Sequence, residues 1–364
     1  MENILIPSFK DKPKWIGNGK QKVVVLMSGG VDSSAVALML KDSGYDVVGL
    51  TMLISNDASV SDYAAEVCKY LNIPHFHVNI QSEFKKRVSS PFRQSYNLGI
   101  TPNPCANCNE HIKFGHLWDI AESAWGDDFY IATGHYARIL RKDGDAYLAR
   151  AMCEERDQTY FLGGIKKERL PRILFPLGDI YAKKETRDLV REKGLPVAER
   201  PESMEICFVN EKGYRSLVTI SKPGDILNLK GEVVGKHKGI ENYTLGQRKG
   251  LGIQNDVPLY VIEISPCNNS IIVAERSLAF SKNVKAEKLN ILAENYLFDG
   301  NTRLLAKTRS QAPLVYCKTL TINENNISAT FETPDFAPAQ GQRLVLYTEE
   351  GIVAAGAIIV PAKS

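Results

Sequence analysis

The chain of 364 residues lacks the features that would place it in a membrane. It has no run of about 18 apolar residues, which a membrane-spanning helix needs, and residues 1–22 hold no apolar segment of signal-peptide length. A strong net charge is also absent, since 45 Lys and Arg against 42 Asp and Glu leave +3, which neither demands nor excludes nucleic acid. Seven cysteines, an odd number, fit a reducing compartment better than a disulfide framework. We therefore expect a cytoplasmic protein without a membrane segment.

The length suffices for two or three domains, and the sequence pattern changes twice along the chain. Residues 23–218 alternate apolar runs with helical patterns, which is typical of a parallel, doubly wound sheet. Closely spaced glycine turns then indicate a small β-hairpin module, and the last segment alternates short apolar strands as in a β-barrel. The predicted domains are α/β at 1–218, β-rich at 219–283 and a barrel at 284–364.

Individual elements of the α/β domain and the barrel can be predicted from periodicity. In the α/β domain we expect strands at residues 46–54, 74–80 and 129–134, and helices at 61–71, 81–96 and 112–125. In the barrel we expect strands at 304–308, 314–320, 327–331, 344–347 and 352–359.

The most informative stretch joins a buried strand, Val23–Met27, to a helix through Ser28-Gly29-Gly30. Backbone N–H groups and the positive end of a helix dipole then surround one point at the carboxyl edge of the sheet, which makes an anion site. The lysine and the spacing of a Walker loop are absent. Ser-Gly-Gly-Val-Asp-Ser instead resembles the pyrophosphate-binding loop of the PP-loop ATPases, which cleave ATP between the α- and β-phosphates and adenylate a substrate.

Two cysteines with the spacing Cys-x-x-Cys, Cys105 and Cys108, lie in a polar, proline-flanked segment that we expect to be a loop before a helix. Thiols at a helix N-terminus have a lowered pKa and are reactive. Alone, the pair fits half of a zinc site, a redox pair or two cluster ligands, and the sequence has no second Cys-x-x-Cys to complete a structural zinc site. A third cysteine, Cys207, stands among apolar residues, where a small core side chain is the usual role.

Further motifs occur in order over most of the chain. They are Thr101–Pro104, Cys108-Asn109, Ile112-Lys113-Phe114, Ala132–Arg138, Asp157–Leu162, Ile206-Cys207-Phe208, Tyr243–Ile253 and Pro338–Gln342. With the Ser-Gly-Gly-Val-Asp-Ser loop, they resemble the tRNA-specific 2-thiouridylase family, the MnmA-type PP-loop enzymes. The run Gly-Gln-Arg-Lys-Gly-Leu-Gly with Ile-Cys-Phe is far more specific than the nucleotide loop.

The resemblance implies ATP-dependent 2-thiolation of the wobble uridine of tRNA, with release of AMP and pyrophosphate. The enzyme would adenylate the C2 oxygen, deliver sulfur from a persulfide on Cys207, and use Cys108 to assist its release. Mg²⁺ would neutralise the triphosphate, with Asp32 as the acidic residue that helps to hold it. The implied ATP-binding residues are Leu26, Met27, Ser28, Gly29, Gly30, Val31, Asp32, Ser33, Met52 and Gly134.

The resemblance also implies an RNA partner. The target base would leave its stack to reach the pocket, where Tyr136 or Phe161 could stack on it. Family members act on the tRNAs for Lys, Glu and Gln and receive sulfur from a cysteine desulfurase or a sulfur-relay protein, and a monomer is the default expectation. The implied tRNA-contacting residues are Asn103, Pro104, Cys105, His135, Arg156, Asp157, Gln158, Arg309, Ser310 and Gln342.

One position departs from the family pattern, because many members have Asp where this chain has Cys105. Three thiolates, those of Cys105, Cys108 and Cys207, could hold a [4Fe–4S] cluster whose open iron binds the sulfur. Alternatively, Cys105 serves as an extra resolving thiol. Two other functions remain open: another PP-loop adenylating enzyme, such as an amidotransferase-type synthetase or a lysidine-forming enzyme, and a non-catalytic tRNA-binding protein.

Overall fold

The computed structural model describes residues 6–7, 21–55, 59–201, 206–209, 213–218 and 221–361, which belong to two compact units. Unit 1 spans Met1–Arg87, Asn107–Met204 and Gly351–Val353. Unit 2 spans Val88–Ala106, Glu205–Glu350 and Ala354–Ser364. The described helices include none with the length and apolar character needed to cross a bilayer.

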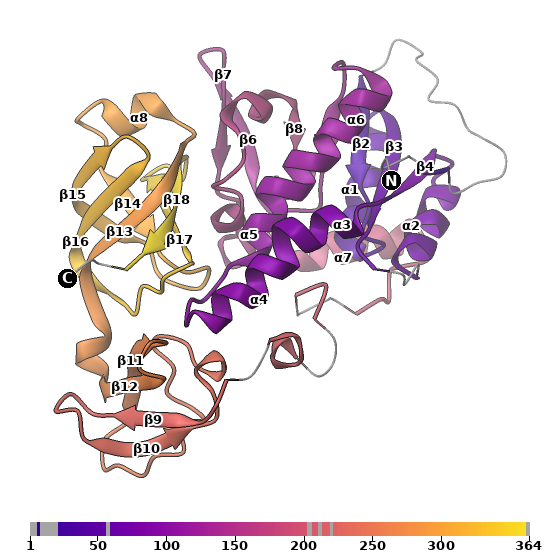
Figure 1. The fold of residues 1–364 in the computed structure, drawn as a ribbon. Helices are drawn as coiled ribbons and strands as arrows, with labels where there is room; N and C mark the ends of the chain where they lie inside the picture. Colours follow the sequence, from indigo (N-terminus) through magenta and orange to yellow (C-terminus); the bar gives the residue numbers. More distant parts are fainter. Residues whose placement is uncertain are drawn as a thin grey trace. The chain divides into compact units, whose positions relative to one another are not determined.

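Unit 1 is built on a six-stranded sheet, part of which is labelled in Figure 1. The strands are β1 (Ile6–Pro7), β4 (His75–Asn79), β3 (Asp46–Leu53), β2 (Lys22–Leu26), β5 (Tyr130–Ala132) and β8 (Ile173–Leu174), in that spatial order. Only β1 pairs antiparallel, and the other five strands run parallel. The apolar runs of β2 and β3 are buried, as expected for parallel strands covered on both faces. The predicted doubly wound sheet is confirmed.

Several described helices belong to unit 1. They are α1 (Val31–Asp42), α2 (Ser59–Tyr70), α3 (Gln81–Phe84), α6 (Leu117–Trp125) and α7 (Lys183–Glu192). One core cluster joins apolar side chains of β2, α1, α2 and α7. A hairpin of β6 (Arg138–Lys142) and β7 (Asp145–Ala149) was not predicted, although its Asp143-Gly144 turn, with positive φ at both residues, is a common hairpin signal.

The helical segments predicted at 81–96 and 112–125 are less regular than expected. The first contains α3, a π-helical segment at Lys85–Ser89 and α4 (Ser90–Asn97). Pro91 follows the wide turn at once and has no N–H to donate to the preceding turn, which favours the irregularity. The second begins earlier, with α5 (Pro104–Cys108) and a π-helical segment at Asn109–His116 before α6.

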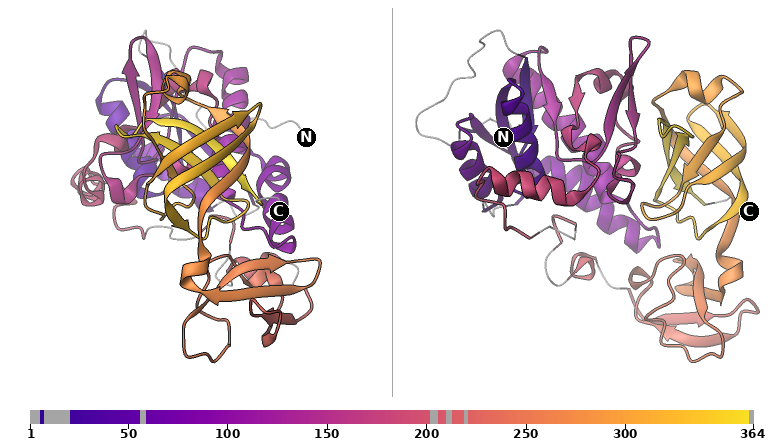
Figure 2. Two further views of the ribbon diagram at one scale, coloured as in Figure 1. Left: turned by 90° about the vertical axis from the view of Figure 1, so that its left-hand side faces the viewer. Right: turned by 180° about the vertical axis from the view of Figure 1, so that it is seen from behind.

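Unit 2 contains a four-stranded sheet and a closed barrel. The sheet has the order β10 (Val233–His237), β9 (Gly224–Leu227), β12 (Ser270–Glu275) and β11 (Leu259–Ser265). The barrel, seen from the side in the left view of Figure 2, contains β13 (Phe280–Ile291), β16 (Asn326–Phe336), β15 (Val315–Asn323), β14 (Leu304–Lys307), β17 (Arg343–Thr348) and β18 (Val353–Val360). Alternate residues of these strands form its core, and α8 (Glu294–Phe298) follows β13. The predicted β-rich module and barrel are confirmed.

Candidate active site

The loop Ser28-Gly29-Gly30 joins β2 to α1 at the carboxyl edge of the sheet. Gly29 has φ 66°, a conformation that glycine adopts without strain. The Gly30 carbonyl accepts hydrogen bonds from Ser34 Oγ at 2.9 Å, from Ser33 Oγ at 3.2 Å and from the Ser34 N–H at 3.2 Å. Ser33 Oγ also accepts a bond from the Ser28 N–H at 3.2 Å. These serines, expected to bind ATP, therefore fix the loop itself.

Arg200 supports the loop from outside and was not predicted from the sequence. Its guanidinium donates a hydrogen bond to the Gly29 carbonyl and lies 3.9 Å from the centroid of the Tyr63 ring. Because the peptide bond is trans, the Gly30 N–H points away from Arg200. The carbonyls of Gly29 and Gly30 are thus engaged by the protein, so these two acceptors are not left to repel an anion at the loop.

A second cation, Lys183 at the start of α7, stands beside the loop. Its Nζ pairs with Asp32 Oδ1, and only 13% of the Lys183 side chain is exposed. The Tyr136 hydroxyl lies 3.5 Å from the same carboxylate oxygen and 2.8 Å from Thr186 Oγ1. Burial, and secondarily the Asp32 charge, raise the pKa of Tyr136, so its hydroxyl stays protonated. No sequence motif pointed to Lys183.

Two predicted ATP-binding residues lie on neighbouring strand ends. Met52 is half-buried near the end of β3, the strand next to β2. Gly134 follows β5, and a Cβ on it would lie 2.8 Å from Asp32 Cβ and 2.9 Å from Ser33 N. The structure therefore brings Met52, Gly134 and the loop to one edge of the sheet, as predicted for parallel strands.

The predicted tRNA contacts of unit 1 differ in exposure. His135 is buried, its Nδ1 lies 2.7 Å from Thr133 Oγ1, and burial holds its pKa well below the ordinary value, so it is neutral. The Asp157 carboxylate is fully buried and accepts bonds from the Ala151 N–H and Thr159 Oγ1.

Gln158 and Arg156 flank this carboxylate. Gln158 Oε1 accepts from the Tyr136 N–H at 2.9 Å, whereas Arg156 is exposed. Among these residues, Arg156 therefore presents its side chain outward, and Asp157 and Gln158 hold the surrounding backbone.

The cysteine pair lies in a helix, so the expectation of a loop is wrong. Asn103 Oδ1 accepts a hydrogen bond from the Ala106 N–H at 3.0 Å, and Pro104 occupies the first turn, so together they start α5. Cys105 and Cys108, three residues apart in this helix, lie on the same side of it. Cys105 is exposed and Cys108 is buried. Asn103, a predicted tRNA contact, is itself buried.

Cys207 is exposed in a turn, not in the core. The Val209 N–H closes the turn on the Ile206 carbonyl at 2.9 Å, and the Phe208 ring packs edge-on against Phe92 of α4 at 5.3 Å. Among the described residues, no group of three His, Cys, Asp or Glu side chains is arranged to hold a metal ion. The [4Fe–4S] cluster stays a prediction without a matching ligand set.

Gln342, a predicted tRNA contact, holds the segment before α5. Its Nε2 donates to the Thr101 carbonyl at 3.1 Å and to the Pro102 carbonyl at 3.2 Å. The Thr101 N–H donates to the Gln340 carbonyl at 3.0 Å. A Cβ on Gly341 would clash with Ile100 and Thr101, so the contact requires glycine. Within unit 2, the barrel therefore positions the approach to Cys105.

Arg309 and Ser310, the other predicted tRNA contacts, are half-buried after β14. The Arg309 guanidinium carbon lies 5.3 Å from the centroid of Phe336, and that of Arg276 lies 5.1 Å from the same centroid. Arg309 Nε is buried without a hydrogen-bond partner. Across the described ranges, neither arginine forms an ion pair. Arg276 was missed because no motif contains it.

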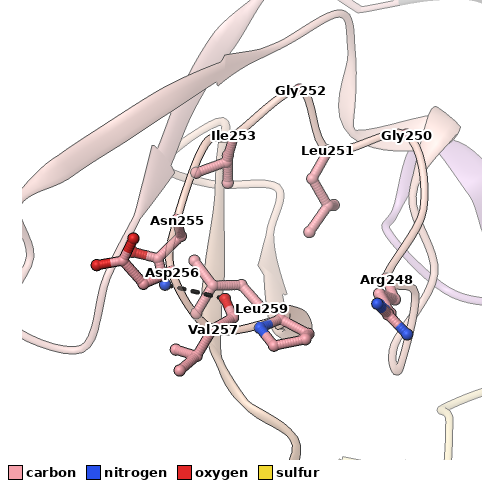
Figure 3. A pocket seen from close by; sticks show the side chains of 10 residues that line it. Arg248, Gly250, Leu251, Gly252, Ile253, Asn255, Asp256, Val257 and Leu259 are labelled. Atoms are coloured by element: carbon pink, nitrogen blue, oxygen red, sulfur yellow. Dashed lines mark hydrogen bonds between the residues drawn. The ribbon is translucent and has the colours of Figure 1, made fainter.

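The motif Gly-Gln-Arg-Lys-Gly-Leu-Gly forms a loop in unit 2 that Gln247 links by hydrogen bonds. Gln247 Oε1 accepts from the Thr244 N–H at 3.1 Å, and its Nε2 donates to the Lys249 carbonyl at 2.9 Å. The loop from Arg248 to Leu259 encloses a pocket of about 300 Å³, shown in Figure 3. Arg248 and Lys249 are exposed, so the loop presents two cations on this unit.

Three family models match consecutive parts of the chain. They are described as the tRNA methyl transferase HUP domain (residues 21–211), the tRNA methyl transferase PRC-barrel domain (217–275) and the aminomethyltransferase beta-barrel domain (281–359). A curated protein from Clostridium tetani, tRNA-specific 2-thiouridylase MnmA 1, is 40% identical over 93% of this chain and 97% of its own. MnmA of Lachnoclostridium phytofermentans is 39% identical over 93% of this chain and 99% of its own length. This chain belongs to the MnmA family of tRNA-specific 2-thiouridylases.

The predicted family and enzyme class are thereby confirmed. Solved structures show only partial likeness. A 4-thiouridine synthetase–RNA complex with bound ATP is 18% identical with a TM-score of 0.35, covering 53% of this chain and 46% of that chain. An NMN synthetase from Francisella tularensis is 19% identical with a TM-score of 0.34, and the match covers 50% of this chain and 67% of that chain.

Proposed function

We propose that this MnmA-family enzyme uses ATP to convert the wobble uridine of tRNA to 2-thiouridine. The observation that carries the proposal is the loop Ser28–Gly30, whose carbonyls are engaged by Arg200 and by the serines of α1. An oligoanion fits such a loop because the Gly29 and Gly30 carbonyls are already paired within the protein and the N-terminus of α1 follows directly. Membership of the MnmA family then favours the uridine of tRNA as the group to be activated.

The first chemical step is adenylation. The C2 oxygen of the uridine attacks the α-phosphorus of ATP, the bond from that phosphorus to the bridging oxygen breaks, and pyrophosphate leaves with the electron pair. The N-terminus of α1 and the nearby Lys183 stabilise the developing negative charge. Asp32, whose carboxylate is 35% exposed, offers the single carboxylate that Mg²⁺ needs beside phosphate oxygens and water.

The second step is sulfur transfer by thiols. The terminal sulfur of a persulfide on Cys207 attacks C2, and AMP leaves. The Cys108 thiolate then attacks Sγ of Cys207 and breaks the S–S bond, whose electron pair stays on the sulfur attached to C2. The products are 2-thiouridine and a Cys108–Cys207 disulfide, which a thiol reductant must reopen. In this route Cys105, three residues before Cys108 in α5, takes the role of the extra resolving thiol that reopens this disulfide.

The exposed Arg156, the half-buried Arg309 and the loop at Arg248 and Lys249 supply positive charge for the RNA backbone. We expect acceptor tRNAs for Lys, Glu and Gln, a cysteine desulfurase or sulfur-relay protein as donor, a monomeric enzyme and a cytoplasmic location, as in the family prediction above.

The test is 2-thiouridine formation on an unmodified glutamate tRNA transcript with ATP, Mg²⁺, and a cysteine desulfurase with L-cysteine, which loads persulfide sulfur, under anaerobic conditions. Metal-free enzyme and iron-reconstituted enzyme are compared. Equal thiolation supports the thiol route, and thiolation only after reconstitution replaces it with the cluster. ATP cleavage to AMP without thiolation, in the presence of a competent sulfur donor, would instead indicate another adenylating enzyme.

A further inference from the structure

Lys183 occupies a position that helix energetics disfavour. The dipole of α7 favours acidic side chains in its first turn, yet the helix opens with Lys183 and Lys184. The start of the helix is capped without them, because Glu185 Oε1 accepts a hydrogen bond from the Ala182 N–H at 2.9 Å. The stability of α7 therefore does not account for a lysine at this point.

The ammonium group of Lys183 is instead held beside the N-terminus of α1. It pairs with Asp32 and lies 5.4 Å from the centroid of the Tyr136 ring. Thr186, on the next turn of α7, contacts the Tyr136 hydroxyl at 2.8 Å and so fixes that ring. Two elements that are distant in sequence thus place one buried cation next to the anion loop.

Asp32 explains why a cation is needed there. Its carboxylate stands in the first turn of α1, where the phosphates of a nucleotide would bind, and an uncompensated negative charge would repel them. Lys183 neutralises that carboxylate when no nucleotide is present. A triphosphate carries more negative charge than one carboxylate, and the flexible stem of lysine lets its ammonium follow the stronger anion.

On the basis of the ATP-dependent reaction proposed above, we infer that Lys183 exchanges partners when ATP binds. It leaves Asp32 and contacts the β- and γ-phosphates, which depart together as pyrophosphate. Asp32 then faces the cation that accompanies the nucleotide. Because AMP has neither of these phosphates, the exchange lets the site retain the substrate ATP and release the product AMP.

The first test compares the affinities of wild-type, K183M and K184M enzyme for ATP and AMP by competition against a fluorescent nucleotide, with EDTA and with Mg²⁺. Methionine keeps the apolar stem of lysine, and Lys184 is the adjacent, exposed control. Because K183M removes a charge-assisted hydrogen bond, we expect its affinity for ATP to fall about 10- to 100-fold. AMP affinity stays within about 3-fold, K183R recovers part of the ATP affinity, and K184M binds both nucleotides like the wild type.

The second test uses D32N, which removes the competing carboxylate. In EDTA, D32N is expected to bind ATP at least as tightly as the wild type, because Lys183 no longer has to leave a charged partner. Three results would overturn the exchange. They are a wild-type ATP affinity in K183M, an equal loss of affinity for ATP and for AMP in K183M, and weaker binding of ATP by D32N in EDTA. If K183M binds and uses ATP normally, this inference and the role given to Lys183 in adenylation fail, whereas ATP-dependent thiolation itself stands. A wild-type enzyme that binds no ATP would overturn the proposed function as well.

Discussion

The pair of arginines on Phe336 predicts a measurable part of the salt dependence of tRNA binding. Among the described residues of unit 2, three arginines lie over aromatic rings. Arg303 stacks 4.0 Å from Tyr316 but is paired with Glu332 at 2.9 Å, whereas Arg276 and Arg309 share Phe336 without an acidic partner in the described parts of the chain. Two like charges over one ring are expected to bind a polyanion such as the RNA backbone.

The magnitude follows from counterion release. Each arginine that neutralises a phosphate contributes about 0.7–0.9 to the slope of log K against log salt concentration. Arg276→Ala and Arg309→Ala should each lower the slope by about that amount, and the double variant by about 1.4–1.8. Between 50 and 200 mM salt, one contact corresponds to about a threefold difference in affinity.

The assay is fluorescence anisotropy of a labelled tRNA transcript, titrated at a series of salt concentrations. Arg303→Ala is the matched control, because its charge is already compensated by Glu332, so its slope should stay at the wild-type value. Slopes of Arg276→Ala and Arg309→Ala that equal the wild-type slope would refute the reasoning. An equally large decrease of the slope in Arg303→Ala would also refute it, since any surface arginine would then contribute equally to the salt dependence.

Three further predictions concern unit 1 and the thiol route. Gly134→Ala should weaken ATP binding about tenfold or more, as measured by nucleotide titration, because its Cβ would lie 2.8 Å from Asp32 Cβ and must displace the start of α1. Cys207→Ser should abolish 2-thiouridine formation yet retain tRNA-dependent pyrophosphate release, and loss of both would contradict the separation of the two steps. Burial, and secondarily His77, lower the pKa of His75 to about 4, so the unfolded chain binds a proton that the folded one does not. His75 should therefore contribute about 3 kcal/mol to the fall in the free energy of unfolding from pH 7 to 4 in urea titrations, and His75→Gln should remove that contribution.

The tautomer of His75 follows from its contacts. The Thr51 hydroxyl donates to the Met27 carbonyl at 3.0 Å and therefore accepts from His75 Nε2–H at 2.8 Å. His75 Nδ1 is buried without a hydrogen-bond partner. Protonation would place an unsatisfied N–H in the core, which agrees with the direction of the pKa shift.

The sequence predicted the elements whose signals are local. The Val23–Met27 run and its glycine turn indicated both the parallel sheet and the anion loop, because strand and helix periodicity change within a few residues. Lys183 and Arg200 could not be predicted, since each reaches the loop across more than 150 residues of sequence. Their contacts with the loop depend on tertiary packing, which no short motif encodes.

The same distinction explains the wrong prediction at the cysteine pair. Two prolines and polar residues are typical of a loop, but Asn103 caps the segment and Pro104 is acceptable in the first turn of a helix, so both cysteines become helical. The buried carboxylate of Asp157 is a related case. The motif Asp157–Leu162 is part of the resemblance to the family and predicted a tRNA contact, yet the Asp157 side chain accepts hydrogen bonds from the Ala151 N–H and from Thr159 Oγ1.

The barrel of unit 2 holds the segment of chain that leads to the cysteine pair. Gln342 and the Gln340 carbonyl hold Thr101 and Pro102, which lead directly to the cap of α5 and to Cys105. Removal of the Gln342 side chain leaves two carbonyls without their donor and loosens this approach. Gln342→Ala should therefore reduce thiolation more than it reduces tRNA affinity in the anisotropy assay. An equal reduction of both would mean that Gln342 acts only as an RNA contact.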